Sequence, residues 1–327
     1  MKVAFTSCID AYDDPSQPVW DKIRQQEPDV LLLLGDLMYM DYGLALTGAE
    51  RPLGWPRKVS DAVFAQTMHE RYARQWGVKS FRELLCTGVR LGAIWDDHDF
   101  AWNDARGQGT ELHHAVSTEK RLIAQGLFRQ FRDVCAMPDV SVYPPMPSLA
   151  SLLGTEEKGI EDYFDVDEVR FVMLDGRSYR QDPNTGPDAD MHGYTQRKWL
   201  GGLLAGEQAL TVLCSGSVLH GATESWDKYL DYQWLLGEAK DKVIVLSGDI
   251  HCNKLPVRHS AHVIEVTSSG GARPGSGGVL SHLGGASGNF GLLEIGNSLS
   301  VKLFSQMQPG GVRADIIFGQ PVAADEM

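Results

Sequence analysis

Short apolar runs alternate with segments of helical spacing along most of this chain. Near-continuous apolar runs of this length are typical of strands that are buried on both faces of a sheet. They occur at residues 2–7, 29–36, 89–95, 211–216, 242–251 and 262–269. Apolar residues three and four positions apart predict helices between them, at residues 18–28, 58–76, 117–134, 195–206 and 226–239. The alternation predicts an α/β fold.

Four stretches depart from this alternation. Residues 160–175 alternate in polarity around an acidic turn, and the runs 290–295 and 299–304 flank a Gly-Asn-Ser turn, so each region predicts a β-hairpin. Residues 137–160 contain four prolines and predict an irregular excursion. The glycine-rich residues 270–288 predict a mobile surface loop.

Length and composition bound the size of the core. The chain has 327 residues, of which 43% are hydrophobic and 22% charged, and this allows one large domain or two smaller ones. Neither an internal repeat nor a clean linker divides the chain, so we predict a single domain over residues 1–327. We expect its irregular insertions near residues 41–60, 137–160 and 268–288.

Charge, cysteine content and the N-terminus narrow the cellular setting. The formal charge is -13, which disfavours bulk binding to nucleic acid or to an anionic membrane. The sequence contains no apolar run long enough for a transmembrane helix, and MKVAFTSCID lacks the shape of a signal peptide. The 5 cysteines are odd in number and follow no disulfide framework, so we expect reduced thiols and a cytoplasmic protein.

Potential metal ligands recur directly after four of the predicted strands. They are Cys8 and Asp10, Asp36 and Tyr39, Asp97 and His98, and Asp249 and His251. Because ligands of α/β sheets bind outside the carboxyl ends of the strands, we expect these side chains to meet in space. Thiolate, phenolate, imidazole and carboxylate are ligands of first-row transition metals, and oxygen donors also suit Ca²⁺ or Mg²⁺. Two metal ions about 3.5–4 Å apart, bridged by a carboxylate, suit in-line displacement at phosphorus.

The joint order of these motifs is more specific than any one of them. GDLMY (35–39), WDDHD (95–99) and GDIH (248–251) each close an apolar strand, and LDGRSYR (174–180) and EVTS (265–268) follow the same order. Together with Gln196, Trp199 and Leu200, the pattern resembles the calcineurin-like metallophosphoesterases, and within them the PhoD-like alkaline phosphatases and phosphodiesterases. The resemblance implies a four-layer α/β/β/α sandwich of two packed mixed sheets and a small phosphoester substrate.

The resemblance also implies a set of metal ligands. Asp36 would bridge two ions. The first ion, Fe³⁺ in PhoD-like proteins, would be bound by Cys8, Tyr39 and His251. The second would be a harder ion such as Ca²⁺, with Mn²⁺, Mg²⁺ or Zn²⁺ as alternatives. It would be bound by Asp249 and by Asp97 or Asn103, and the sequence leaves the choice between these two open.

His98 and two arginines would complete the catalytic machinery. The implied mechanism is attack of a metal-activated hydroxide on phosphorus, without a covalent enzyme intermediate. His98 would stabilise the transition state or protonate the leaving oxygen. Arg177 and Arg180 would bind phosphate oxygens as bidentate forks, unless they pair with Asp175 or Asp182 instead.

Several residues near the motifs keep two interpretations. Asp10 is either an extra metal ligand or a solvated residue at a strand end. We expect Asp96 and Asp99 to cap a helix or to orient His98 rather than to bind metal. The local pattern around His220 does not fix its role.

Two other functions compete with a phosphoesterase. A metal-dependent hydrolase of another bond, such as an amide or a lactone, predicts histidine-rich ligands, but only His98 and His251 stand at suitable positions. A catalytically inactive metal-binding scaffold predicts a missing ligand or a replaced His98. In the assignment above every ligand is present and His98 is retained. The sequence therefore favours a metal-dependent phosphoester hydrolase.

Overall fold

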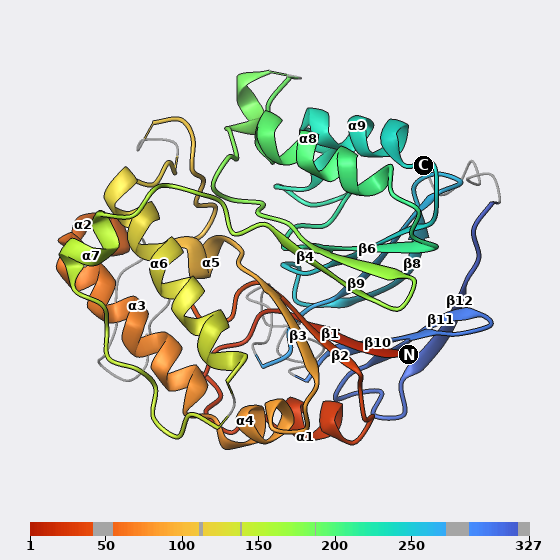
Figure 1. Cartoon of the computed structure of the whole chain (residues 1–327), viewed down its shortest axis with the longest axis horizontal. Coiled ribbons are helices and arrows are strands. Elements are labelled where there is room, and N and C mark those ends of the chain that lie inside the picture. Colours follow the sequence, from red (N-terminus) through yellow and green to blue (C-terminus); the bar gives the residue numbers. More distant parts are fainter. Residues whose placement is uncertain (42–54, 111–113, 138, 187, 273–287, 320–327) are drawn as a thin grey trace.

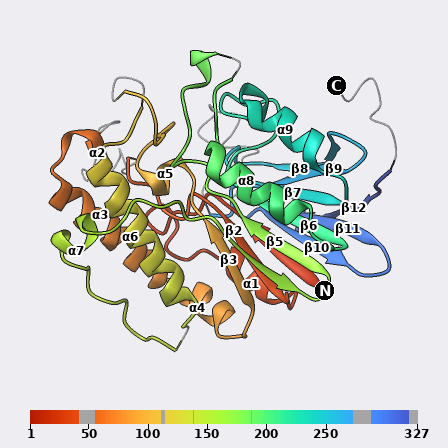
Figure 2. The ribbon, with the colours of Figure 1, turned by 45° about the horizontal axis from the view of Figure 1, so that its top comes forward.

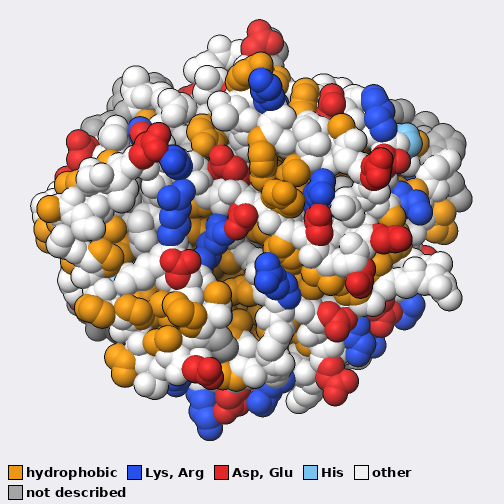
Figure 3. Space-filling view, viewed as in Figure 1, with side chains coloured by type: hydrophobic (Ala, Val, Ile, Leu, Met, Phe, Trp, Pro, Cys, Tyr) orange, Lys and Arg blue, Asp and Glu red, His pale blue; other side chains and the backbone are white. Residues whose placement is uncertain are grey.

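The computed structural model describes residues 1–41, 55–110, 114–137, 139–186, 188–272 and 288–319. Two six-stranded sheets pack face to face in this part of the chain, and helices cover their outer faces (Figure 1). None of the described helices combines the length and the apolar character that a membrane span requires. On the face seen in Figure 3, basic and acidic side chains are interspersed rather than gathered by sign.

The first sheet joins the two ends of the chain. Its strand order is β12-β11-β10-β1-β2-β3. The parallel strands are β1 (Lys2–Thr6), β2 (Val30–Leu34) and β3 (Arg90–Ile94). From β1 the sheet continues antiparallel through β10 (Phe290–Ile295), β11 (Leu299–Phe304) and β12 (Val312–Ile316). The predicted hairpin at 290–304 is thus confirmed.

The second sheet is parallel in its centre and antiparallel at both edges. Its strand order is β4-β5-β6-β7-β9-β8. The parallel strands are β5 (Val169–Met173), β6 (Leu210–Ser215), β7 (Val243–Ser247) and β9 (Val263–Ser268). The edges are β4 (Asp162–Val166), which forms the predicted hairpin with β5, and β8 (Asn253–Arg258).

The near-continuous apolar runs of the second sheet follow from burial of both its faces. Phe171 and Met173 of β5 point into the core between the sheets, whereas Val172 between them packs under the outer helices. Strands β6 and β7 divide their residues in the same way. Because successive side chains alternate between faces, a strand covered on both sides has to be apolar throughout.

The helices form the two outer layers and a separate lateral group (Figures 1 and 2). Helices α8 (Gly193–Leu204) and α9 (Leu230–Glu238) cover the second sheet. Helices α1 (Val19–Arg24) and α4 (Lys79–Leu85) lie along the first. At the side, α3 (Asp61–Trp76) packs on α6 (Thr118–Cys135), with α2 (Trp55–Lys58), α5 (Asp97–Phe100) and α7 (Leu149–Leu153) nearby. The predicted α/β/β/α sandwich is confirmed.

Element boundaries differ from the sequence predictions in a few places. The helix expected at 58–76 begins at Asp61, because the Ser60 side chain accepts the Val63 N–H at 3.4 Å and caps it. The helix expected at 226–239 begins as a 3₁₀ turn, η3 (Trp226–Lys228), and another such turn is η2 (Pro183–Thr185). Helix α7 interrupts the excursion at 137–160.

Parts of two predictions fall outside the described residues. These are most of the expected insertion at 41–60 and most of the glycine-rich loop at 270–288. The single domain over residues 1–327 stays a prediction.

Candidate metal centre

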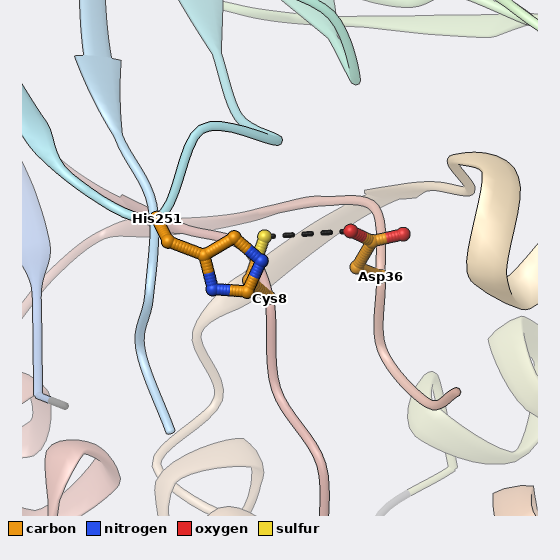
Figure 4. A group of neighbouring side chains, drawn as sticks. All are labelled: Cys8, Asp36 and His251. Atoms are coloured by element: carbon orange, nitrogen blue, oxygen red, sulfur yellow. Dashed lines mark hydrogen bonds between the residues drawn. The ribbon is translucent and has the colours of Figure 1, made fainter. Parts of the chain in front are cut away.

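The expected convergence of strand ends takes place at one edge of the sandwich. Cys8 follows β1, Asp36 follows β2, and His251 follows β7 of the opposite sheet. Figure 4 shows these three side chains facing one another, with the Cys8 Sγ 3.4 Å from Asp36 Oδ2. Parallel strands of both sheets thus end at a common site, as the sequence predicts.

Asp36 lies at the centre of the predicted ligands. In each of three separate groups, a carboxylate oxygen of Asp36 lies within 4.8 Å of the donor atoms of the other members. These groups are Cys8 with His251, Asp97 with His98, and Asp96 with Asp249. A carboxylate shared in this way is placed as a bridge between two metal ions would require.

The backbone at this edge adopts a rare conformation. Cys8, Asp36, Asp249 and His251 all have positive φ, at 57°, 52°, 70° and 52°. A left-handed conformation is costly for a residue with a Cβ and persists only where the surrounding structure imposes it. The strand exits therefore turn sharply, and such strain is typical of functional sites.

Tyr39 and Cys8, two of the predicted ligands of the first ion, lie close to Asp36. The buried Tyr39 hydroxyl is 3.3 Å from Asp36 Oδ2 and 3.4 Å from His251 Nε2. The buried Cys8 thiol lies 3.0 Å from the Ser269 hydroxyl, and burial raises its pKa. A thiol held in this way ionises readily only when a positive charge approaches it.

The electrostatics of the site call for positive charge. Burial, followed by the proximity of Cys8 and Asp97, raises the pKa of Asp36 well above its usual range. Burial, with Asp96 and Asp97, raises the pKa of Asp249 to about 7. Carboxylates crowded in a buried place ionise together only beside cations. The thiol, phenol, imidazole and carboxylate donors therefore fit metal ions both in chemistry and in charge.

His98 is oriented by a residue that the sequence analysis missed. Its Nδ1 lies 2.7 Å from Asp41 Oδ1, and both side chains are buried. Burial alone lowers the pKa of His98, but Asp97, Asp36 and Asp41 raise it to about 10. Asp41 stands five positions after Asp36 in the sequence. Apart from this spacing, nothing in the sequence indicates a role for Asp41, because its contact with His98 depends on β2 and β3 ending side by side.

Asp97 and Asn103 occupy neighbouring positions around this histidine. Asp97 accepts the His98 N–H at Oδ1, at 3.0 Å, and the Asp104 N–H at Oδ2, at 2.6 Å. The Asn103 N–H donates to Asp41 Oδ2 at 2.8 Å. The choice between Asp97 and Asn103 as a metal ligand stays open on these contacts.

Arg177 and Arg180 are more buried than arginines that bind the phosphate of a substrate need to be. Each is 1% exposed. Arg177 donates to Asp96 Oδ1 at 2.6 Å and to Glu224 at 2.5 Å, and Arg180 donates to Glu224 at 2.9 Å and to the Ser217 hydroxyl at 2.7 Å. Phosphate binding by these arginines stays a prediction. Their structural task is to neutralise Asp96 and Glu224.

The alternative partners proposed from the sequence for these arginines are wrong. Asp175 instead accepts the Trp95 indole N–H and backbone N–H groups, and Asp182 pairs with Arg106 at 3.1 Å. Glu224 was missed altogether, because it lies in the loop after β6, far along the chain from both arginines.

Asp99 has the supporting role expected of it. It is the third residue of α5, and its Oδ1 accepts the Asp96 N–H at 2.5 Å. Its Oδ2 accepts the Leu37 N–H at 3.0 Å. Asp99 therefore caps α5 and ties the exit of β2 to that of β3, and these bonds position the backbone around His98.

Asp10 and His220 lie outside the donor groups around Asp36. Asp10 is 2% exposed and accepts the Tyr12 N–H at 2.9 Å, so the solvated interpretation is wrong. Among the described residues, the groups arranged to hold a metal do not include Asp10. The His220 side chain is 59% exposed and lies 3.5 Å from Asp227.

Comparisons with known proteins agree with the resemblance in the motifs. A family model described as PhoD-like phosphatase matches residues 3–266. No curated protein matches the chain.

Solved structures with a similar chain path are distant in sequence. The phosphoesterase Yfce from E. coli is 11% identical, with 97% of each chain covered and a TM-score of 0.35. A putative 5'-nucleotidase from Staphylococcus aureus is 12% identical, with 100% of this chain and 57% of the other covered and a TM-score of 0.41. The NAD nucleotidase of Haemophilus influenzae is 13% identical, with 97% and 49% covered and a TM-score of 0.39. The chain thus spans about half the length of the two nucleotidases, and similarities this distant carry no argument about activity.

Proposed function

The chain belongs to the PhoD-like phosphatase family and is a phosphoesterase, and from this premise we propose that it hydrolyses small phosphoesters at a dinuclear metal site centred on Asp36. The observation that carries the proposal is that three groups of buried or half-buried donors share the Asp36 carboxylate. A mononuclear site would need only one of these groups.

The donors divide into a softer and a harder half. Cys8, Tyr39 and His251 would hold Fe³⁺, while Asp249 and either Asp97 or Asn103 would hold Ca²⁺ or another hard divalent ion. Two bound ions would supply Lewis-acid polarisation of the phosphoryl group and would generate a nucleophile from water at neutral pH.

His98 would act on the leaving group. Asp41 contacts its Nδ1, so we expect the other ring nitrogen, Nε2, to face the substrate. The nearby carboxylates of Asp97, Asp36 and Asp41 raise the pKa of His98 and so favour the protonated ring. Nε2 would donate this proton to the leaving oxygen, and the Nδ1 bond to Asp41 would hold the ring in place during the transfer.

Metal analysis combined with hydrolysis assays tests this function. We expect about two metal ions per chain, and we expect hydrolysis of p-nitrophenyl phosphate or of its bis-ester to be lost on chelation and restored by Fe and Ca. A well-folded protein that binds no metal and stays inactive after both metals are added contradicts the proposal. Turnover of amide or lactone substrates alone would indicate a different hydrolase, and bound metal without any turnover would indicate an inactive scaffold.

The colour of the iron-loaded protein tests the role of Tyr39. A phenolate bound to Fe³⁺ absorbs visible light through charge transfer, and the Tyr39 hydroxyl already lies 3.3 Å from Asp36 and 3.4 Å from His251. We expect a visible band in the iron-loaded wild type and its loss in Tyr39→Phe at equal iron content. Tyr163→Phe, at an exposed tyrosine of β4, is the control and should keep the band. A colourless iron-loaded wild type would show that Tyr39 is not a ligand.

A further inference from the structure

Asp96 has one carboxylate oxygen engaged and one without a partner. Its Oδ1 accepts the Nε–H of Arg177 at 2.6 Å. Its Oδ2 is buried and has no hydrogen-bond partner among the described residues. The whole residue is 1% exposed, so bulk water does not reach this oxygen. Since buried polar atoms in native proteins are nearly always bonded, an orphaned carboxylate oxygen inside a candidate metal centre points to a cation as its partner.

The position of Asp96 fits that partner. Asp96, Asp36 and Asp249 each offer an oxygen, and the three oxygens lie within 4.8 Å of one another. They come from the exits of β3, β2 and β7, so one ion between them would connect both sheets. Three carboxylate oxygens suit a hard divalent ion rather than a soft one.

Two glycines leave room for this carboxylate. Gly35 has a φ of 90°, and a Cβ built on it would lie 2.7 Å from the Asp96 Cβ. A Cβ on Gly216, at the exit of β6, would collide with the Asp96 side-chain oxygen Oδ1. The exits of β2 and β6 therefore close directly on Asp96, which fixes the carboxylate before any ion arrives.

The neighbouring Asp97 is bonded differently. Both of its oxygens accept backbone N–H groups, from His98 and from Asp104. These bonds hold the loop that carries Asn103, and they leave no orphaned oxygen. Asp97 also shares a donor group with Asp36, but unlike Asp96 it has no oxygen without a hydrogen-bond partner, and its bonds support the loop.

We infer that Asp96, through Oδ2, is a direct ligand of the second metal ion together with Asp36 and Asp249, and that Asp97 positions the loop beside it. This inference rests on the proposed dinuclear site. It reverses the supporting role that the sequence favours for Asp96, and of the two alternatives proposed above for the second ion, Asp97 and Asn103, it keeps only Asn103. It also explains the role of Arg177, because the bond from Arg177 to Asp96 Oδ1 keeps Oδ2 directed at the ion.

Matched substitutions of the two adjacent aspartates test the inference. The full-length protein, loaded with iron, is titrated with Mn²⁺ as the probe of the second position. Loss of a supporting partner typically lowers metal affinity about 10–100-fold, so we expect Asp97→Asn to fall in this range and Asp96→Asn to exceed it. The reverse order overturns the inference. Asparagine keeps an oxygen for Arg177, and the visible iron band reports that each variant is folded.

A thiolate reporter tests for a direct bond. In Asp96→Cys, added Co²⁺ should give sulfur-to-cobalt charge transfer beyond that of the wild type, which already has Cys8. Asp97→Cys should give no such increase. An increase only in Asp97→Cys overturns the inference. A wild type that binds one ion or none refutes the dinuclear function itself, whereas a wild type that binds two ions, with Mn²⁺ affinity unchanged in Asp96→Asn, refutes only the role of Asp96.

Discussion

Replacing Asp36 by asparagine is expected to remove both metal ions and to reduce hydrolysis of p-nitrophenyl phosphate to background. Asp36 is the one carboxylate common to all three donor groups around it. An amide carries no charge and bridges two cations poorly, so both halves of the site lose a ligand at once. Metal content by elemental analysis, measured beside activity on the same preparation, checks this result. Retention of both ions in Asp36→Asn would falsify the bridging role.

Asp10→Asn is the matched control. Asp10 is also a buried aspartate at the exit of a strand of the first sheet, but it lies outside the donor groups of the described residues. We expect this variant to keep both ions and to lose little activity. Loss of one ion in Asp10→Asn would instead establish it as the extra ligand that the sequence allowed.

Stability separates ligand loss from misfolding in these variants. Burial raises the pKa of Asp36 above its usual range. At neutral pH the carboxyl therefore ionises more readily in the unfolded chain than in the metal-free folded protein, and this difference lowers the free energy of unfolding. Asp36→Asn has no carboxyl to ionise and so removes this destabilising effect. In the presence of a chelator its free energy of unfolding should therefore equal or exceed that of the wild type, whereas added metal should stabilise only the wild type.

The sequence predicted the meeting of the strand ends because two simple rules suffice for it. A strand such as Val30–Leu34, buried on both faces, is apolar throughout, and parallel strands end at the same edge of a sheet. The edge strands β8 and β12 were missed because they lack such runs. Strand β8 contains Pro256, and β12 alternates partly buried with exposed residues. Helices as short as α5 show too few turns for a periodicity to appear.

The partners of the site residues were beyond local patterns. Arg177 meets Asp96 across the interface of the two sheets, and Glu224 reaches the same guanidinium from the loop after β6. The motifs therefore indicated which segments carry chemistry, but the roles predicted for Asp96 and Arg177 rested only on the residues next to them in the sequence. Burial and hydrogen-bond partners, which only the fold provides, separate a side chain that faces the site from one that supports it.

Replacing His98 by glutamine is expected to lower kcat by about 10²–10⁴, the usual contribution of a general acid, while both metal ions stay bound. Glutamine fills similar space and can donate a hydrogen bond, but it cannot transfer a proton to the leaving oxygen. The measurement is kcat for p-nitrophenyl phosphate together with metal content. Loss of metal from His98→Gln would show that the imidazole is a ligand rather than an acid.

The leaving group decides whether His98 acts as the acid. Phenolate is a stronger base than p-nitrophenolate and needs protonation more, so His98→Gln should slow phenyl phosphate more than p-nitrophenyl phosphate. Asp41→Asn should show the same dependence with a smaller loss, because it weakens the 2.7 Å contact that holds Nδ1 but keeps the imidazole. A histidine that only stabilises charge on the transferred phosphoryl group would slow both substrates equally. That result would leave Asp41 as a residue that fixes the ring and would remove the proton transfer from the mechanism.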